Sequence, residues 1–255
     1  MFKYLKIYNL NYKKRRIGPK SDGGYVLLDK ISKNVDNLFC FGVENNIDFE
    51  IDFNLKYKPR KIILYDHTIK KLPKKTNFKF IKKGLSFKKT KKFITLDDLR
   101  IKKSTNNILK MDIEYDEWNV FENVSLKTLS YFNQIICEFH FFFLNSKNIN
   151  SERLTPYFTN FSKNNYNKIN LLLKIRYEKI LKKILKNFSI FHLSANNSLP
   201  LKNLFNKKFP QLIELSLIRN DLIKEKKIFK GNLPIKNLDF PNKPYKADLE
   251  SFYPF

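Results

Sequence analysis

The chain is poor in several residue types, and each shortage excludes a class of protein. Its two cysteines, Cys40 and Cys137, stand inside apolar runs, so we expect buried thiols in a reducing, cytoplasmic setting and neither a disulfide framework nor a zinc site. The longest candidate for a membrane span, residues 139–144, contains His140 and is far shorter than the ~20 residues that cross a bilayer. Charges interleave with apolar residues through the first 16 positions, unlike a signal peptide.

Acidic residues are half as numerous as basic ones, 24 against 50, and the formal net charge is +26. Such a charge is typical of nucleic-acid-binding proteins. However, lysine occurs 43 times, arginine seven times and alanine twice, with the lysines distributed along the whole chain. This skew favours AT-rich coding drift, so nucleic acid is not the expected partner. A nucleic-acid-binding protein or RNA methyltransferase stays as the alternative, and the basic surface leaves peripheral membrane contact open.

Glycines and prolines are few, and short β-rich runs recur between them. The runs are residues 37–41, 61–65, 78–81, 107–111, 134–139, 189–193 and 212–218. Most are continuously apolar, as strands buried on both faces should be. Between the early runs, residues 48–58, 95–100 and 116–130 can form helices. The alternation predicts a single α/β domain with a mainly parallel sheet and helices on both faces.

Three regions differ in character. Residues 1–35 are predicted to be an N-terminal lid segment, and residues 36–223 the main domain, with a helical insertion at 148–187. Residues 224–255, which contain four prolines, are predicted to be an irregular tail. Within the insertion, Leu172, Ile175, Ile184 and Leu185 are predicted to share one helical face. We expect that helix to pack on the sheet, with a membrane-surface helix as the alternative.

Polar residues follow the predicted strands, where doubly wound sheets bind their ligands. Asp66 lies 24 residues beyond Gly42, close to the spacing at which nucleotide-binding folds place a carboxylate for the ribose hydroxyls. Each residue alone is common in turns and caps, but together they indicate one site. The set is Gly42, Glu44, Asp66, Leu85, Ser86, Asp112, Glu114, Glu138, His140, His192, Asn196 and Asn197.

The turn after the first predicted strand lacks the full G-x-G-x-x-G pattern, because Glu44 occupies the second glycine position. A carboxylate there disfavours a pyrophosphate, which needs bare backbone N–H groups, and so disfavours a nicotinamide cofactor. It suits a cofactor with a positive charge and no phosphate. S-adenosylmethionine, a nucleoside with a sulfonium, has this chemistry.

Three segments resemble a known family. LKMDIEYDEW (109–118) resembles the LK-(I/M)-D-(I/V)-E-G-x-E-W segment of FkbM-type and related class I S-adenosylmethionine-dependent methyltransferases, with Tyr115 in place of glycine and Asp116 in place of a small residue. FGVENNIDFE resembles their first motif, and RIGPKSDGGYVL an N-terminal segment of one branch. The resemblance extends from Arg16 to Asn220. It implies a Rossmann-like, seven-stranded sheet with an antiparallel last strand, an S-adenosylmethionine-binding domain at 36–223, and methyl transfer to a sugar, glycan or other small-metabolite hydroxyl.

The resemblance also implies roles for individual residues. Gly42 and Glu44 would line the methionine part of the cofactor, Asp66 would hold the ribose, and Leu85 and Ser86 would lie by the adenine. Asp112 would lie near the sulfonium and the acceptor, with Glu114 ordering the loop. A lid or substrate contact would come from Arg16, Asp22, Gly23, Tyr25, His192, Asn196 and Asn197.

A hydroxyl is a weak nucleophile, so its methylation needs a general base or a metal ion. His140 is the candidate base, with Asp112 beside it. Alternatively, Asp112, Glu138, His140 and Asn197 could bind Mg²⁺, or His140 could merely pack. Asp116 and Glu117 are assigned to the start of the next helix. No Asn/Asp-Pro-Pro-aromatic tetrad of amino-directed enzymes is present, which favours an oxygen acceptor, and no pattern indicates an oligomeric state.

Overall fold

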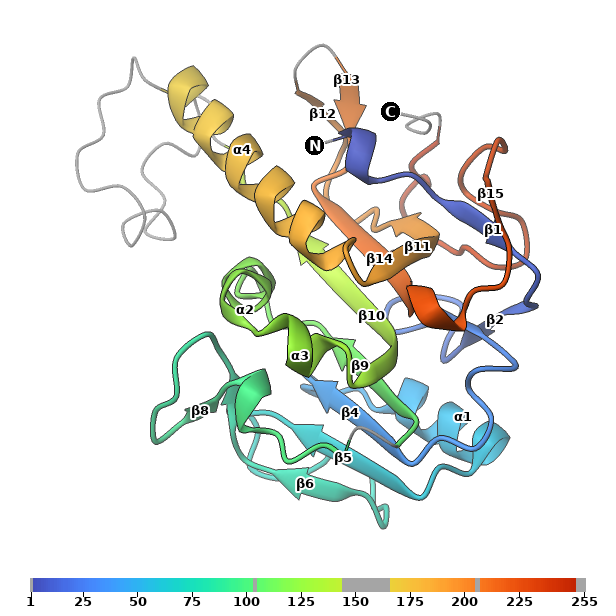
Figure 1. Cartoon of the computed structure of the whole chain (residues 1–255), viewed down its shortest axis with the longest axis vertical. Helices are drawn as coiled ribbons and strands as arrows, with labels where there is room; N and C mark the ends of the chain where they lie inside the picture. The colour runs from blue at the N-terminus through green and yellow to red at the C-terminus, as the bar shows by residue number, and fades with distance from the viewer. Residues whose placement is uncertain (1, 103–104, 144–165, 205–206, 251–255) are drawn as a thin grey trace.

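The computed structural model describes residues 2–102, 105–143, 166–204 and 207–250. It is built on a seven-stranded sheet in the order β11-β14-β10-β9-β4-β5-β6 (Figure 1). The strands are β4 (Asn37–Phe41), β5 (Lys61–Tyr65), β6 (Lys79–Ile81), β9 (Asn107–Met111), β10 (Phe132–His140), β11 (Phe188–Ala195) and β14 (Leu212–Arg219). Strand β14 runs antiparallel to both neighbours, and β10, β9, β4, β5 and β6 pair in parallel. The predicted α/β fold and its antiparallel last strand are confirmed.

Alternate strand residues enter two separate cores, which explains why the runs are continuously apolar. In β4, Phe39 and Phe41 belong to one cluster, whereas Leu38 and Cys40 belong to the other. A strand covered on both faces needs apolar side chains at both parities. Cys40 and Cys137 are buried and free.

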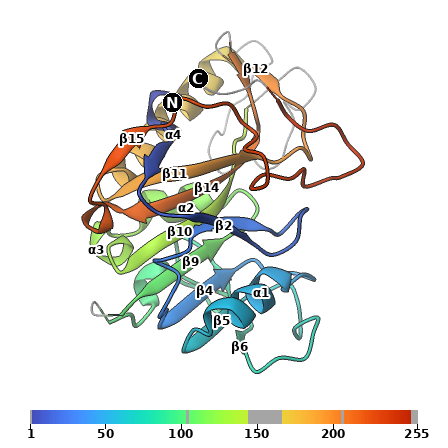
Figure 2. The ribbon, with the colours of Figure 1, turned by 90° about the vertical axis from the view of Figure 1, so that its right-hand side faces the viewer.

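Helices cover both faces of the sheet (Figures 1 and 2). Helix α1 (Asp48–Tyr57) lies on one face, and α2 (Glu117–Asn123), α3 (Leu126–Leu129) and α4 (Tyr166–Ile184) lie on the other. The helix predicted at 116–130 is broken in two, because the Ser125 hydroxyl accepts a hydrogen bond from the Thr128 N–H and starts a new helix. Residues 95–100 contain only a 3₁₀ turn, η2 (Leu96–Asp98), closed by a Thr95–Asp98 capping box.

The predicted apolar face of α4 is wrong at two positions. Leu172 is 46% exposed and Ile175 is 51% exposed. The buried stripe instead consists of Ile169, Leu173, Tyr177, Ile180, Leu181 and Ile184, which recur every three or four residues. Tyr177 packs on Trp118 of α2, with ring centroids 4.3 Å apart, and this contact sets the rotation of the helix. The part of the predicted insertion at 148–165 lies outside the described residues.

Both ends of the described chain lie on the β11–β14 side of the molecule (Figure 2). Strand β1 (Tyr8–Leu10) pairs with β15 (Lys226–Ile228), and β2 (Lys14–Ile17) pairs with β3 (Tyr25–Leu28). The remaining elements are η1 (Phe2–Tyr4), η5 (Asn220–Leu222), and the short pairs β7 (Gly84–Leu85) with β8 (Phe93–Ile94) and β12 (Lys202–Leu204) with β13 (Lys207–Phe209). Across the described ranges, no helix has both the length and the apolarity to cross a membrane.

Candidate functional site

The loops that follow β4 and β9 touch at a glycine. Gly42 has φ +74°, and a Cβ atom there would lie 1.6 Å from the carbonyl oxygen of Asp112. The Asp112 N–H donates to the Phe41 carbonyl at 3.0 Å, and the Gly42 N–H donates to the Tyr65 carbonyl at 3.1 Å. Only glycine tolerates both this conformation and this approach. Gly42 therefore brings the carboxyl ends of three adjacent strands, β5, β4 and β9, within contact of one another.

Asp66 braces the loop after β4. Its Oδ2 accepts from the N–H groups of Val43 and Glu44 at 3.0 and 2.9 Å, and its Oδ1 accepts from the N–H and hydroxyl of Thr68. Burial disfavours its charge, but these hydrogen bonds outweigh burial and lower the pKa of Asp66. Asp66 is thus ionised and already engaged with protein donors, and the predicted ribose contact stays a prediction.

A cavity of about 360 Å³ lies between the loops after β5 and β9. Its walls are partly apolar, from Tyr65, Leu85 and Phe93, and Ser86 and Asp66 reach it as polar groups. Leu85 and Ser86 therefore line this cavity, and their predicted contact with adenine stays a prediction. A flat aromatic base with a hydroxylated ribose suits such mixed walls.

A second cavity of about 240 Å³ adjoins the first and shares Gly42, Glu44, Asp112 and Glu114 with it. The N-terminal segment closes its far side with Asp22, Gly23 and Tyr25. Lys110 reaches the cavity from β9 and forms a buried ion pair with Glu50, Nζ to Oε1 3.2 Å. The shared wall of the two cavities is therefore acidic, which favours a cation at their junction.

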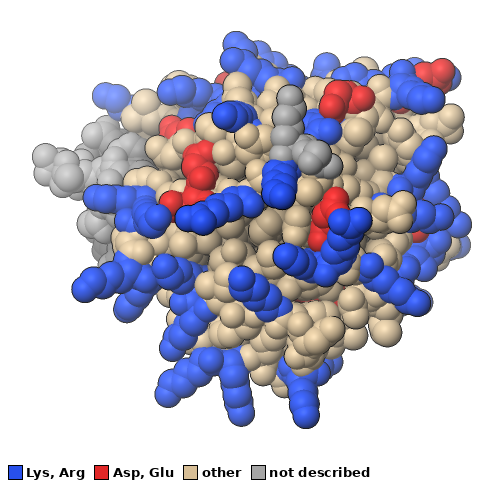
Figure 3. Space-filling model, turned by 60° about the horizontal axis from the view of Figure 1, so that its bottom comes forward, with Lys and Arg blue, Asp and Glu red and all other residues tan. Residues whose placement is uncertain are grey.

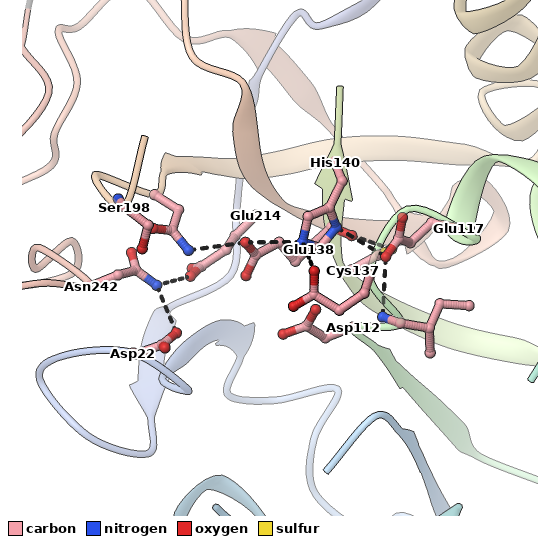
Figure 4. A network of polar contacts seen from close by, with 12 residues as sticks. Asp22, Asp112, Glu117, Cys137, Glu138, His140, Ser198, Glu214 and Asn242 are labelled. Carbon is pink, nitrogen blue, oxygen red and sulfur yellow. Dashed lines mark hydrogen bonds and ion pairs between the residues drawn. The ribbon is translucent and has the colours of Figure 1, made fainter. Parts of the chain in front are cut away.

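His140 ends β10 beside this acidic wall (Figure 4). Its Nδ1 lies 3.0 Å from Glu117 Oε1, and its Nε2 lies 3.4 Å from Glu114 Oε2 and 3.8 Å from Glu138 Oε1. Burial opposes its charge, but the hydrogen bond and charge of Glu117, with the charges of Asp112 and Glu114, raise the pKa of His140. Burial raises the pKa of Asp112 to about 6, against the positive charges of His140 and Lys110.

Glu117 is a site residue that the sequence reasoning missed. Glu117 begins α2, as the sequence predicts, but its side chain is also fully buried, and its Oε1 accepts from the Ile113 N–H at 3.1 Å. One carboxylate therefore holds both the histidine ring and the loop after β9. The signal was present, because Glu117 is the glutamate of the E-W pair that ends the resembling segment 109–118.

Tyr115 occupies a backbone conformation that favours glycine. It has φ +80°, and Glu114 before it has φ +55°. Its ring lies on His140, with centroids 4.8 Å apart. Tyr115 therefore costs backbone strain, and its ring packs against the imidazole of His140.

Two glutamates face each other across the sheet next to this site. Glu138 on β10 pairs in register with Glu214 on β14, and both are buried. Asn196 donates to Glu138 at 2.9 Å, and Asn242 donates to Glu214 at 3.0 Å (Figure 4). Burial raises the pKa of Glu138 well above its usual value, and the charge of Asp112 adds to that rise. Burial raises the pKa of Glu214 to about 7.

Replacing Glu214 with Gln should flatten the dependence of stability on pH. A carboxyl whose pKa rises on folding stabilises the folded state below its unfolded pKa, and this contribution is lost as pH rises through the folded value. A rise from 4.5 to about 7 corresponds to about 3 kcal/mol. Urea unfolding at pH 4 and pH 8 should show that the wild-type protein loses this much more free energy of unfolding than the variant. Exposed Glu225→Gln is the control, and equal losses in all three proteins would refute the assignment.

Three predicted lid or substrate residues do not reach the cavities. The guanidinium of Arg16 donates to the backbone carbonyls of Pro19, Ser21 and Leu238, so it stabilises the loop that follows β2 and does not reach the cavities. His192 is buried, with Nε2 2.7 Å from Asp239 Oδ1. Asn197 donates to carbonyls of residues 243–247 and accepts from the Lys243 N–H. Asn196, by contrast, touches the site through Glu138.

The predicted metal set is not brought together as proposed, because Asn197 binds the tail. Asp112, Glu114 and His140 instead place one ligand atom each within 4.8 Å of one another. Such a trio could hold a divalent cation if the histidine were neutral. The raised pKa of His140 favours a proton in that position.

A family model matches most of the chain, whereas the similarities to solved structures are weak. Residues 10–183, more than half of the chain, match the family model of the methyltransferase FkbM domain. No curated protein matches the chain. M. jannaschii TYW2 in complex with AdoMet is similar at 11% identity and a TM-score of 0.34, over 74% of this chain and 73% of that one. The plantazolicin methyltransferase BpumL in complex with SAH is similar at 14% identity and a TM-score of 0.34, over 72% and 76%. At these scores, the family match is the informative comparison.

Proposed function

The chain belongs to the FkbM family of S-adenosylmethionine-dependent methyltransferases, and from this premise we propose that its acceptor is a hydroxyl group of a sugar, glycan or other small metabolite. The observation that carries the proposal is the His140–Glu117 pair at the acidic wall of the cavities. A hydroxyl needs its proton removed as it attacks, whereas a neutral amine already has a free lone pair. A buried histidine backed by a carboxylate supplies that base.

The two joined cavities fit S-adenosylmethionine. The larger one has walls suited to adenosine, and Gly42 lines it where the loops after β4 and β9 touch. Glu44, Asp112 and Glu114 line the junction, where their charge complements a sulfonium and an ammonium group. When bound, this cofactor supplies an electrophilic methyl group on a good leaving group. The role of the protein is to align the acceptor with that methyl group and to exclude water.

We propose that His140 takes the acceptor proton at Nε2, with Glu117 holding Nδ1. Glu114 lies on the Nε2 side, and its side chain is 66% exposed, so it can move aside when an acceptor enters. Tyr25 donates to Asp112 Oδ2 at 3.3 Å and thereby links the N-terminal segment to the same wall. Asp22, Asn45 and Asn46 also line the smaller cavity, and these groups suit a ligand with several hydroxyls.

The acceptor proposal is tested with methyl-labelled S-adenosylmethionine. The purified protein is incubated with panels of sugars and nucleotide sugars, of small amines, and of total RNA, and the products are analysed by mass spectrometry and NMR. We expect label in methyl ethers of a polyhydroxylated acceptor. Label found only in methylamines or in RNA bases would overturn the proposal. Addition of EDTA should leave the rate unchanged, and restoration of a lost rate by Mg²⁺ would instead favour the metal alternative.

Cofactor binding can be tested separately from the acceptor. Titration of S-adenosylhomocysteine in a calorimeter should give micromolar binding, weakened at least about tenfold in Asp66→Ala, because that variant frees the loop of Val43 and Glu44 and leaves their N–H groups unpaired. Asp221→Ala removes an exposed carboxylate paired with Arg219, remote from the cavities, and should bind like wild type. If both variants bound S-adenosylhomocysteine with equal affinity, Asp66 would not be part of the cofactor site.

A further inference from the structure

The positive charge is concentrated on one edge of the molecule. Residues 56–92 contain 15 lysines and arginines and one acid, and the other 218 residues contain 35 and 23. This segment, hereafter the lysine face, includes the end of α1, all of β5 and β6, and the loops around them. Lysines do occur along the whole chain, but this segment alone carries +14 of the formal net charge of +26.

The lysine face is accessible and weakly neutralised. Fourteen of its 15 basic residues are exposed, and Lys83 is half-buried. In the described chain, three of them pair with acids: Arg60 with Asp36, Lys74 with Asp48 and Lys89 with Asp98. Figure 3 brings this side of the molecule forward and shows basic side chains spread over it with few acids between them. Such a surface attracts a polyanion.

An exposed aromatic residue stands among these lysines. Phe87 is 49% exposed in the turn of residues 86–92, SFKKTKK, which we call the Phe87 loop. Hydrogen bonds fix the conformation of this turn. The Thr90 hydroxyl accepts from the N–H groups of Lys92 and Phe93, and the Thr90 N–H donates to the Phe93 carbonyl. It thus holds one apolar side chain beside the four exposed lysines 88, 89, 91 and 92.

We propose that the lysine face docks on an anionic phospholipid bilayer, with Phe87 inserted at the headgroup boundary. Clustered lysines bind the negative surface of such a bilayer as point charges, and an aromatic side chain adds apolar burial. The face has 14 lysines and one arginine, whereas base-reading surfaces use the bidentate fork of arginine. The scarcity of arginine disfavours base readout, and the exposed Phe87 among the lysines supplies the apolar burial that contact with a bilayer uses.

The proposal is tested by vesicle flotation of the full chain. Vesicles of phosphatidylcholine with 30% phosphatidylglycerol should bind it at 100 mM NaCl, pure phosphatidylcholine should not, and 500 mM NaCl should release it. Replacing Lys88, Lys89, Lys91 and Lys92 with Gln should weaken binding at least about tenfold. Phe87→Ser should weaken it several-fold with no change in charge.

A matched control variant removes the same number of positive charges from a surface outside the lysine face. Lys224, Lys227, Lys230 and Lys236 are exposed near the other edge. Their replacement with Gln removes the same charge and should weaken vesicle binding by less than about threefold. Equal losses in the two quadruple variants would overturn the proposal, as would no binding to phosphatidylglycerol vesicles. Salt-dependent binding to an RNA oligonucleotide without vesicle binding would assign the face to nucleic acid instead.

Discussion

His140→Gln is expected to lower the rate of methyl transfer by about a hundred- to ten-thousand-fold, the usual contribution of a positioned general base. Binding of S-adenosylhomocysteine should change by no more than a few-fold, because His140 lines neither cavity. The measurement combines single-turnover transfer with calorimetric titration of the same preparation. Full activity in the variant would leave the histidine as a packing residue, and a matched loss of affinity and rate would indicate a structural role.

The pH dependence of the rate separates a base from a packing residue. His140 has a raised pKa and acts as a base only when neutral, so the rate should rise with pH above the ordinary histidine range. Glu117→Gln removes the nearest negative charge and should move that rising limb to lower pH. Glu122→Gln, on the same helix but bonded to Arg176, is the matched control and should leave the limb in place. A limb that stays fixed in Glu117→Gln would contradict the pairing.

Gly42→Ala should have the second-largest effect, and it should lower the stability of the fold and the affinity for S-adenosylhomocysteine. The added methyl group would lie 1.6 Å from the Asp112 carbonyl oxygen in a residue held at φ +74°. Strain and overpacking of this kind each cost about 1–3 kcal/mol, so the free energy of unfolding should fall by about 2–6 kcal/mol. Separation of the loops after β4 and β9 should also weaken S-adenosylhomocysteine binding by more than about tenfold.

Gly231→Ala provides the comparison for this variant. A Cβ there would meet the outer end of the Phe229 ring at 2.6 Å, and a ring can rotate away where a strand-end carbonyl cannot. Stability and affinity should therefore change little. If Gly42→Ala bound S-adenosylhomocysteine as tightly as Gly231→Ala, the close approach of the two loops would not be part of the cofactor site.

The sheet was predictable because its signal is local. Each strand is a short apolar run, and the residue that follows the run lies at the ligand edge by geometry alone. That is why Gly42, Glu44, Leu85, Ser86, Asp112 and Glu114 were placed together from the sequence and line the cavities in the structure. The face of α4 was less predictable, since Leu172 and Ile175 fit a helical repeat as well as the buried stripe does, and only the contact with Trp118 decides between them.

The remaining differences depend on contacts between distant segments. Asn197 follows β11, as site residues do, and His192 lies within that strand, but residues 243–247 bind Asn197 and Asp239 binds His192. No local pattern specifies where an irregular tail of this length will lie. The contact of Glu117 with His140 could not be predicted for a related reason. Glu117 does lie in the first turn of α2, where a glutamate usually acts on the helix terminus, and its burial against His140 appears only once β10 is placed.

The tail also bears on where the catalytic domain ends. Asn242 donates to both Asp22 and Glu214, and Asp239 holds His192 and accepts from the Ile235 N–H. Strand β15 adds a backbone ladder to β1. Residues 226–242 therefore fasten β1 and the loop that contains Asp22 to the rest of the domain. A protein cut after β14 would keep the order of the sheet strands but lose this fastening.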